Sequence, residues 1–447
     1  MLLRHALAAA LLSLALAPAA VAQGTKATLT GYDVLSRHGR QVELRAKLER
    51  TGVMGIHPDV AGESLDCYLV EQDGEELDEA RYLGSGETDD DGVAAVRWKP
   101  ATPGQYLVEA RVRRRSDYVA LPARILVAVP AADRPVLLVQ LDGTASKATN
   151  VQLFRGTENA KIEAVEGAAA VLAELSQRYQ LAYLTDLEVA FTGKFKDWLE
   201  LRELPPAPVI FWELFERSLS HTTYMDRLVG RLRKLLPQTT IGIGGAADGQ
   251  AFVRHGLSAI AVGAGSGQVE ATVLRAEGWQ DVPARVRGVE RAEELLREMA
   301  QGGSETEAAL QELLLYGPDG IAAVHRFRSE TDVALASAAA LVAARLEANR
   351  AFLEALDLSS ANAALSSLIA AWRYGERGVV ARLYADLQAG TAAPLPSFRR
   401  VEVVTRNEPE PDKVVFRLRL LGDDAAEHEL VFVRQDDKLW RLDVQDF

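Results

Sequence analysis

Short apolar runs alternate with helical periodicity between residues 134 and 283, and this alternation limits the possible folds more than any other feature of the chain. The run Val136–Leu141 is almost continuously apolar, which is typical of a strand covered on both faces of a sheet. Helical periodicity follows at Ile162–Tyr179. Further short, largely apolar runs continue the pattern at Leu181–Leu184, Val209–Trp212, Thr239–Ile243 and Ala259–Val262. This order of segments predicts an α/β domain with a parallel sheet over residues 134–283.

Residues 24–130 precede this domain and are predicted to be all-β. Apolar and polar side chains alternate with a period of two in Val42–Leu48 and again in Tyr106–Val112, as in half-buried strands. Turn signals such as Asp90-Asp91-Gly92 separate the strands. The stretch that begins at Thr88 resembles bacterial immunoglobulin-like sandwiches, and a length of about a hundred residues suits that fold.

Residues 286–358 are predicted to be helical, because Glu290–Met299 and Glu305–Leu315 have amphipathic periodicity. A helix initiated by Gly-Pro and an Ala-rich helix at Val333–Leu346 follow, and together they resemble a HEAT-type hairpin. A stable array of such repeats needs about three or more units. A plain helical connector therefore explains the same pattern.

Residues 361–447 are predicted to form an α+β domain. Two helices, Ala363–Trp372 and Val379–Leu387, come before alternating strands. The closing stretch Phe432–Val444 resembles the last hairpin of NTF2-like domains. Such domains bind ligands or protein partners more often than they catalyse reactions.

The N-terminus has the pattern of an export signal. Arg4 and His5 precede the apolar run Ala6–Ala17, which is too short to span a bilayer. Small residues at Ala20 and Ala22 mark a cleavage site. We predict that residues 1–22 are a signal peptide cleaved after Ala22, and that the mature protein is secreted or periplasmic. No later stretch reaches about 18 consecutive apolar residues, so no transmembrane span is predicted.

The overall composition narrows the possible partners. The 447 residues carry a formal net charge of −13, with 50 basic and 63 acidic side chains. This acidity, without any Lys/Arg-dense run, argues against a nucleic-acid partner. Cys67 is the only cysteine, so no internal disulfide can form. Its place between Leu65 and Leu69 predicts that it packs inside a strand.

The first apolar run of the α/β domain ends in Gln140-Leu141-Asp142-Gly143-Thr144. This segment resembles the first motif of the haloacid-dehalogenase-like (HAD) phosphatases, in which the first Asp attacks phosphorus and the second protonates the leaving group. Gln140 stands at the attacking position. Its amide is delocalised and uncharged, so it cannot serve as the nucleophile. The resemblance therefore implies a phosphatase scaffold that lacks its main reagent.

Later segments continue the resemblance in the same order. Thr185 ends the second predicted strand, where the family has a Ser or Thr. The family's phosphate-binding Lys is absent, and Arg227 is the candidate substitute. The Gly-rich segment with Gly244 and Asp248 resembles the lipin and Nir-type lipid-sensing branch. Asp248 matches its retained acid, whereas Gly245 stands where an Asn or a first acid is expected.

In that branch the lipins hydrolyse phosphatidate, whereas Nir-type members with a neutral residue at the nucleophile position bind it. The resemblance therefore implies non-hydrolytic binding of a phosphate-bearing small molecule or lipid headgroup, or of a protein partner through the immunoglobulin-like or NTF2-like domain. The candidate ligand-binding residues are Asp142, Gly143, Thr144, Thr185, Arg227, Gly244 and Asp248.

A metal cofactor is not expected. The candidate Mg²⁺ ligands are Asp142 with its carbonyl, Gln140 with its amide oxygen, and Asp248, which is a poor set for this ion. Two other functions fit the sequence. One is a weak Mg²⁺-dependent phosphatase with a rearranged site, and the other is a structural envelope scaffold with an inert α/β core.

Overall fold

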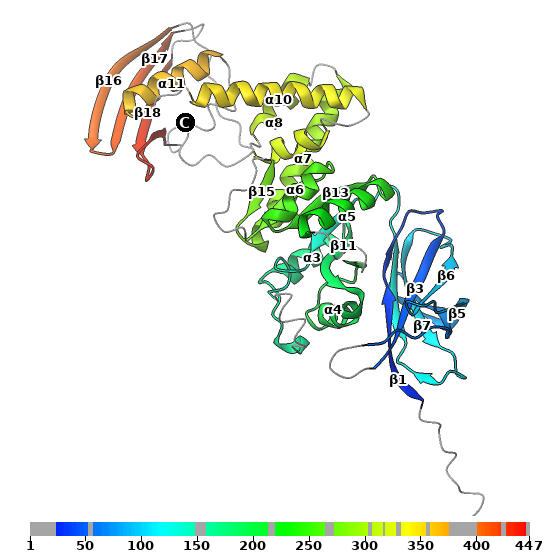
Figure 1. Cartoon of the computed structure of the whole chain (residues 1–447). Helices are drawn as coiled ribbons and strands as arrows, with labels where there is room; N and C mark the ends of the chain where they lie inside the picture. Colours follow the sequence, from blue (N-terminus) through cyan, green and yellow to red (C-terminus); the bar gives the residue numbers. More distant parts are fainter. Residues whose placement is uncertain are drawn as a thin grey trace, which may run out of the picture. The chain divides into compact units, whose positions relative to one another are not determined.

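The structure is a computed structural model (Figure 1), and its chain divides into two compact units. The first holds residues 1–164, 172–224 and 232–238, and the second holds residues 165–171, 225–231 and 239–447. The predicted signal peptide, residues 1–22, and the predicted helix Val379–Leu387 lie outside the described residues. These are residues 24–51, 57–147, 158–212, 220–263, 272–302, 306–315, 318–327, 332–354, 358–374, 400–421 and 426–443.

The first unit begins with a β-sandwich, as the sequence predicts. One sheet has the order β6-β3-β1-β8 and the other has the order β2-β9-β7-β4-β5. Most neighbouring strands are antiparallel, and β4 and β5, which are consecutive in the chain, are joined by a short turn at Asp73 and Gly74. The bounds are Thr25–Tyr32 (β1), Val34–Leu35 (β2), Val42–Arg50 (β3), Ser64–Gln72 (β4), Glu75–Glu87 (β5), Val93–Trp98 (β6), Gly104–Val112 (β7), Tyr118–Val119 (β8) and Ala123–Val129 (β9).

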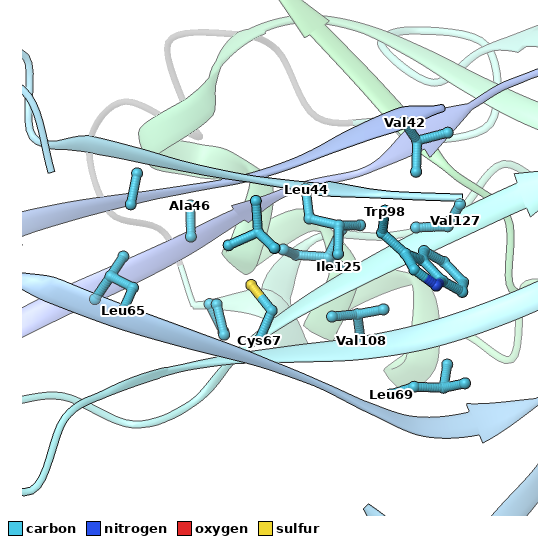
Figure 2. Packing of buried hydrophobic residues seen from close by; sticks show 14 of the residues in the cluster. Val42, Leu44, Ala46, Leu65, Cys67, Leu69, Trp98, Val108, Ile125 and Val127 are labelled. Carbon is cyan, nitrogen blue, oxygen red and sulfur yellow. The ribbon is translucent and has the colours of Figure 1, made fainter. Parts of the chain in front are cut away.

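The alternating apolar residues of these strands fill the core of the sandwich (Figure 2). Leu44 and Leu48 of β3 are almost fully buried, and so is Cys67 of β4, which confirms the prediction for the cysteine. Burial raises the pKa of the Cys67 thiol to about 11. The rings of Trp98 and Tyr106 meet edge to face, with centroids 5.1 Å apart. The core therefore rests on apolar packing rather than on a cross-link.

The predicted parallel α/β arrangement is also present. In the first unit, β10 (Val136–Gln140) pairs in parallel with β11 (Gln180–Glu188), which pairs with β12 (Val209–Trp212). All residues of β10 are buried, as expected of a strand covered on both faces. Three more parallel strands belong to the second unit: β13 (Thr239–Gly244), β14 (Ser258–Val262) and β15 (Val273–Ala276).

One helix of the α/β region is shorter than the sequence predicts. Helical periodicity extends over Ile162–Tyr179, but α3 covers only Ala168–Ser176. Gly167 has a φ of +79°, which is incompatible with a right-handed helix, so α3 can begin only after it. The other elements are η1 (Asn159–Lys161), α4 (Val189–Leu201), α5 (His221–Leu235) and α6 (Ala246–Arg254).

The second unit continues with packed helices. Leu295 and Leu296 of α7, Leu313 of α8, Ala323 of α9 and Val342 of α10 share one buried cluster. A buried ion pair between Arg326 and Glu293 also links α9 to α7. Among the helices in the described ranges, none combines the length and apolar character needed to cross a membrane. The bounds are Trp279–Asp281 (η3), Val282–Gln301 (α7), Thr306–Leu315 (α8), Pro318–Phe327 (α9) and Val333–Glu354 (α10).

The C-terminal part contains helix α11 (Ala361–Tyr374) and an antiparallel sheet of order β16-β17-β18-β19. Phe416 of β17 and Phe432 of β18 meet edge to face on the buried side of this sheet, with centroids 5.7 Å apart. The strands are Arg400–Glu410 (β16), Lys413–Leu421 (β17), Ala426–Arg434 (β18) and Trp440–Leu442 (β19). The specific likeness to NTF2 domains and to HEAT repeats stays a prediction.

Candidate functional site

The candidate site lies at the carboxyl ends of β10 and β11, within the first unit. The N–H of Leu141 donates to the carbonyl of Leu184 at 2.8 Å and so extends the pairing of the two strands. The chain then turns tightly at Gly143, whose φ is +71°. The carbonyl of Leu141 accepts hydrogen bonds from Ala145 at 3.1 Å and Ser146 at 2.9 Å, which close the turn. A glycine is favoured there because other residues rarely adopt this conformation.

Asp142 and Thr185, two residues predicted for the site, lie side by side. The hydroxyl of Thr185 donates to Oδ2 of Asp142 at 2.8 Å. The N–H of Asp186 donates to the same oxygen at 2.7 Å. The register between β11 and β12 shifts between Leu184 and Glu188, so this segment departs from regular strand pairing at the site. The carboxylate of Asp142 is thus held by two residues of β11 that follow the last residue paired with β10.

Gln140 is buried at the centre of this group, with 1% of its surface exposed. Its Nε2 lies 3.2 Å from Oδ1 of Asp186 and 3.5 Å from Oδ2 of Asp142. The nitrogen of an amide donates and its oxygen accepts, so the nitrogen belongs on the side of the two carboxylates. Oε1 is buried and has no hydrogen-bond partner among the residues that the structure describes.

Asp186 and His221 complete the cluster, and sequence reasoning missed both as site residues. Nδ1 of His221, the first residue of α5, lies 2.8 Å from Oδ2 of Asp186, which is an ion pair when the imidazole is protonated. The His221 side chain is 34% exposed and that of Asp186 is 13% exposed. Asp186 directly follows Thr185 and could have been noticed. His221 could not, because no sequence spacing links it to the end of β11.

The residues of the cluster do not fit a Mg²⁺ ion. HAD-like phosphatases use carboxylates around such an ion, and Mg²⁺ needs several oxygen ligands at short distance. Here the amide N–H groups of Gln140 are directed at the carboxylates of Asp142 and Asp186, the place that a cation would take. Within the described ranges, no group of three or more His, Cys, Asp or Glu side chains is arranged to hold a metal.

The other predicted site residues, Gly244, Asp248 and Arg227, belong to the second unit. Oδ2 of Asp248 accepts a hydrogen bond from the N–H of Gly245 at 2.7 Å, at the start of α6. A carboxylate in the first turn satisfies a free N–H group and complements the helix dipole. A Cβ on Gly244 would lie 2.7 Å from Cβ of Asp248, so the glycine permits this close approach. Both residues thus have a structural role in the turn.

No protein-family model matches the chain, and no curated protein matches it. Solved structures that are similar to part of it include the PKD domain of human KIAA0319 (11% identity, TM-score 0.17, 25% of this chain and 88% of that chain). Two others are the fibronectin(III)-like modules of Clostridium thermocellum CbhA (16%, 0.15, 23% and 95%) and the PKD domain of an M14-like peptidase from a Thermoplasmatales archaeon (14%, 0.16, 24% and 98%). These TM-scores are too low to support an argument about function.

Proposed function

We propose that this protein is an exported pseudophosphatase, which keeps the strand-and-loop frame of a HAD-like phosphatase and binds its ligand without hydrolysis. The position of Gln140 carries the proposal, because its amide nitrogen is held against the carboxylates of Asp142 and Asp186. A neutral amide at this point can neither attack phosphorus nor leave room for Mg²⁺. Loss of a covalent nucleophile costs many decades of rate.

For the ligand, we propose a phosphomonoester headgroup at the Gly143 turn, with His221 as the neighbouring cation. Turns with free N–H groups bind anions, but the N–H groups of residues 144–146 already donate to the carbonyl of Leu141 at this turn, so a phosphate would rely on Gly143 and His221. The carboxylates of Asp142 and Asp186 oppose such binding, since two like charges ~4 Å apart cost roughly 4 kcal/mol at an effective dielectric of about 20. A protonated His221, 2.8 Å from Asp186, offsets one of these charges. Binding of the phosphate would therefore depend on the positive charge of His221.

A hydrolysis assay tests the loss of the reaction. With p-nitrophenyl phosphate and Mg²⁺, we expect no turnover by the unaltered chain. Gln140→Asp restores the carboxylate, and turnover gained by this variant must disappear when Asp142→Asn is added. If the unaltered chain hydrolyses the substrate and Asp142→Asn abolishes this activity, the protein is instead a weak phosphatase with a rearranged site.

Liposome flotation tests the ligand. We expect the protein to float with vesicles of phosphatidylcholine and phosphatidate, and to stay behind with vesicles in which phosphatidylglycerol replaces phosphatidate at equal charge. His221→Gln should weaken retention on the vesicles. Thr185→Val should also change retention, because it removes the hydrogen bond from the Thr185 hydroxyl to Asp142. Soluble glycerol phosphate should compete if the headgroup alone is recognised.

A structural scaffold with an inert α/β core is the second candidate, and one observation favours it. Thr185 and Asp186 both direct donors to Asp142, so these donors are used inside the protein. No retention on phosphatidate, together with no effect of His221→Gln, would support the scaffold.

A further inference from the structure

A cavity of about 320 Å³ lies in the first unit, between the outer face of the β2-β9-β7-β4-β5 sheet and helix α4 with the loop that follows it. Val108 and Ile125 point into the sandwich core, so Leu107 and Leu126, their neighbours in β7 and β9, lie on the opposite face. The apolar part of the lining consists of Leu107, Leu126, Leu199, Leu204, Pro206 and Ala207.

The polar wall of the cavity is held rigidly by Asp33. Its side chain is 1% exposed and forms an ion pair with Nζ of Lys196 at 2.7 Å. Its carboxylate also accepts hydrogen bonds from the N–H groups of Leu126 at 2.7 Å and Val209 at 2.9 Å. A buried carboxylate with this many donors fixes the elements that supply them. The cavity is therefore formed before any ligand arrives.

Both cations in the lining are already satisfied. Lys196 also donates to the carbonyls of Gly31 at 3.0 Å and Arg124 at 2.8 Å, so each of its three N–H groups has an acceptor. The guanidinium of Arg124 pairs with Asp197 at 2.8 Å and with Glu200 at 3.0 Å. An anionic ligand would find no uncommitted cation in this lining.

Glu71 is the lining carboxylate without a hydrogen bond or ion pair to any part of the chain that the structure describes. Its side chain is part of the rim and is half-buried. The lining acids Asp33, Glu71 and Glu200 outnumber the two cations, so the cavity has a surplus negative charge at Glu71. A cationic group at the rim would be favoured.

We propose that this cavity binds a small amphipathic molecule with an apolar body and a cationic group. The body contacts Leu107, Leu126 and Leu199, and the cation pairs with the carboxylate of Glu71. A volume of about 320 Å³ is within the usual range of small-molecule pockets, which are mostly apolar with a few orienting polar groups. The site shares no residue with the Gln140 cluster and is independent of the proposed phosphate ligand.

Three probes of similar shape and different charge test this site on the intact chain: phenethylammonium, phenethyl alcohol and hydrocinnamate. Saturation-transfer NMR titrations give their relative affinities. We expect phenethylammonium to bind best and hydrocinnamate worst. Glu71→Gln should lower the affinity for phenethylammonium about five-fold, the effect of a partly exposed ion pair, and leave the alcohol unchanged. Glu79→Gln, an exposed carboxylate on β5, is the matched control and should change nothing.

A substitution that fills the cavity is the second test of the proposal. Leu107→Trp places an indole in the apolar part and should abolish binding of all three probes, while circular dichroism confirms the fold. If that variant does not fold, Leu107→Ala should weaken all three, because it removes apolar contact. The proposal is overturned if no probe binds, if Glu71→Gln leaves the preference for the cation intact, or if these Leu107 variants bind as the parent does.

Discussion

Gln140 has two effects on the cluster at the carboxyl ends of β10 and β11. Its uncharged amide cannot act as a nucleophile, and its nitrogen lies within hydrogen-bonding distance of the carboxylates of Asp142 and Asp186, which reduces the repulsion between them. The same residue therefore explains why the cluster is stable with two acids close together. The sequence predicts the first effect, because an amide is a poor nucleophile. It does not predict the second, because Asp186 enters the cluster only through the pairing of β10 with β11.

Gln140→Asp should convert this stable cluster into a cation-dependent one. Without divalent ions, we expect the free energy of unfolding to fall by about 3 kcal/mol, since a buried carboxylate is placed beside two others. Mg²⁺ should recover part of the loss. Urea unfolding in EDTA and in Mg²⁺ measures both effects. Gln140→Asn is the neutral control and should not respond to Mg²⁺. Full stability of Gln140→Asp in EDTA would contradict the arrangement.

Cys67 predicts a pH dependence of stability. Its thiol has a pKa of about 11 in the folded protein, because burial disfavours the thiolate, against about 8.5 for an exposed cysteine. Above pH ~9 the unfolded chain binds fewer protons than the folded one, so stability falls as pH rises, by about 3 kcal/mol at pH ~11. Urea unfolding against pH checks this. Cys67→Ala should lack this part of the slope, and identical slopes would refute it.

At the scale of elements, strand alternation predicts much of the sandwich and the parallel strands, because burial of one or both faces directly determines residue type. Residue alternation does not predict an element's bounds where backbone conformation or strand pairing determines them. Gly167 delays α3 through its backbone conformation. β5 extends over Glu75–Glu87 although most of its side chains are exposed, so its pairing with β4 and not burial maintains it.

Gly242 of β13 illustrates a constraint between elements. A Cβ at this position would lie 2.2 Å from the ring of Phe252 in α6, and that ring is fully buried. We expect Gly242→Ala to destabilise the protein by about 2 kcal/mol through overpacking. Thermal unfolding measures the effect. Gly193→Ala is the control: this glycine is helical with open space around it, so alanine should leave stability unchanged or raise it.

At the scale of the whole molecule, the two compact units do not follow the order of the sequence. Residues 165–171 and 225–231 belong to the second unit, although the segments around them belong to the first. The order of segments along the chain predicts consecutive domains, and nothing in it indicates that residues 165–171 and 225–231 belong to the second unit. Cutting the chain between residues 238 and 239 would therefore separate residues 165–171 and 225–231 from the rest of the second unit.

The sandwich has a core of its own, and this permits a test of its connection to α4. We expect a fragment of residues 24–130 to fold cooperatively. In the intact chain, Asp33→Ala should cost about 3 kcal/mol, because it leaves the half-buried Lys196 without its counter-charge. In the fragment Lys196 is missing, so the same substitution should cost much less. Urea unfolding of the four proteins gives both values. Equal costs in chain and fragment would mean that Asp33 acts only inside the sandwich, whereas a cost confined to the intact chain would assign it to the junction with α4.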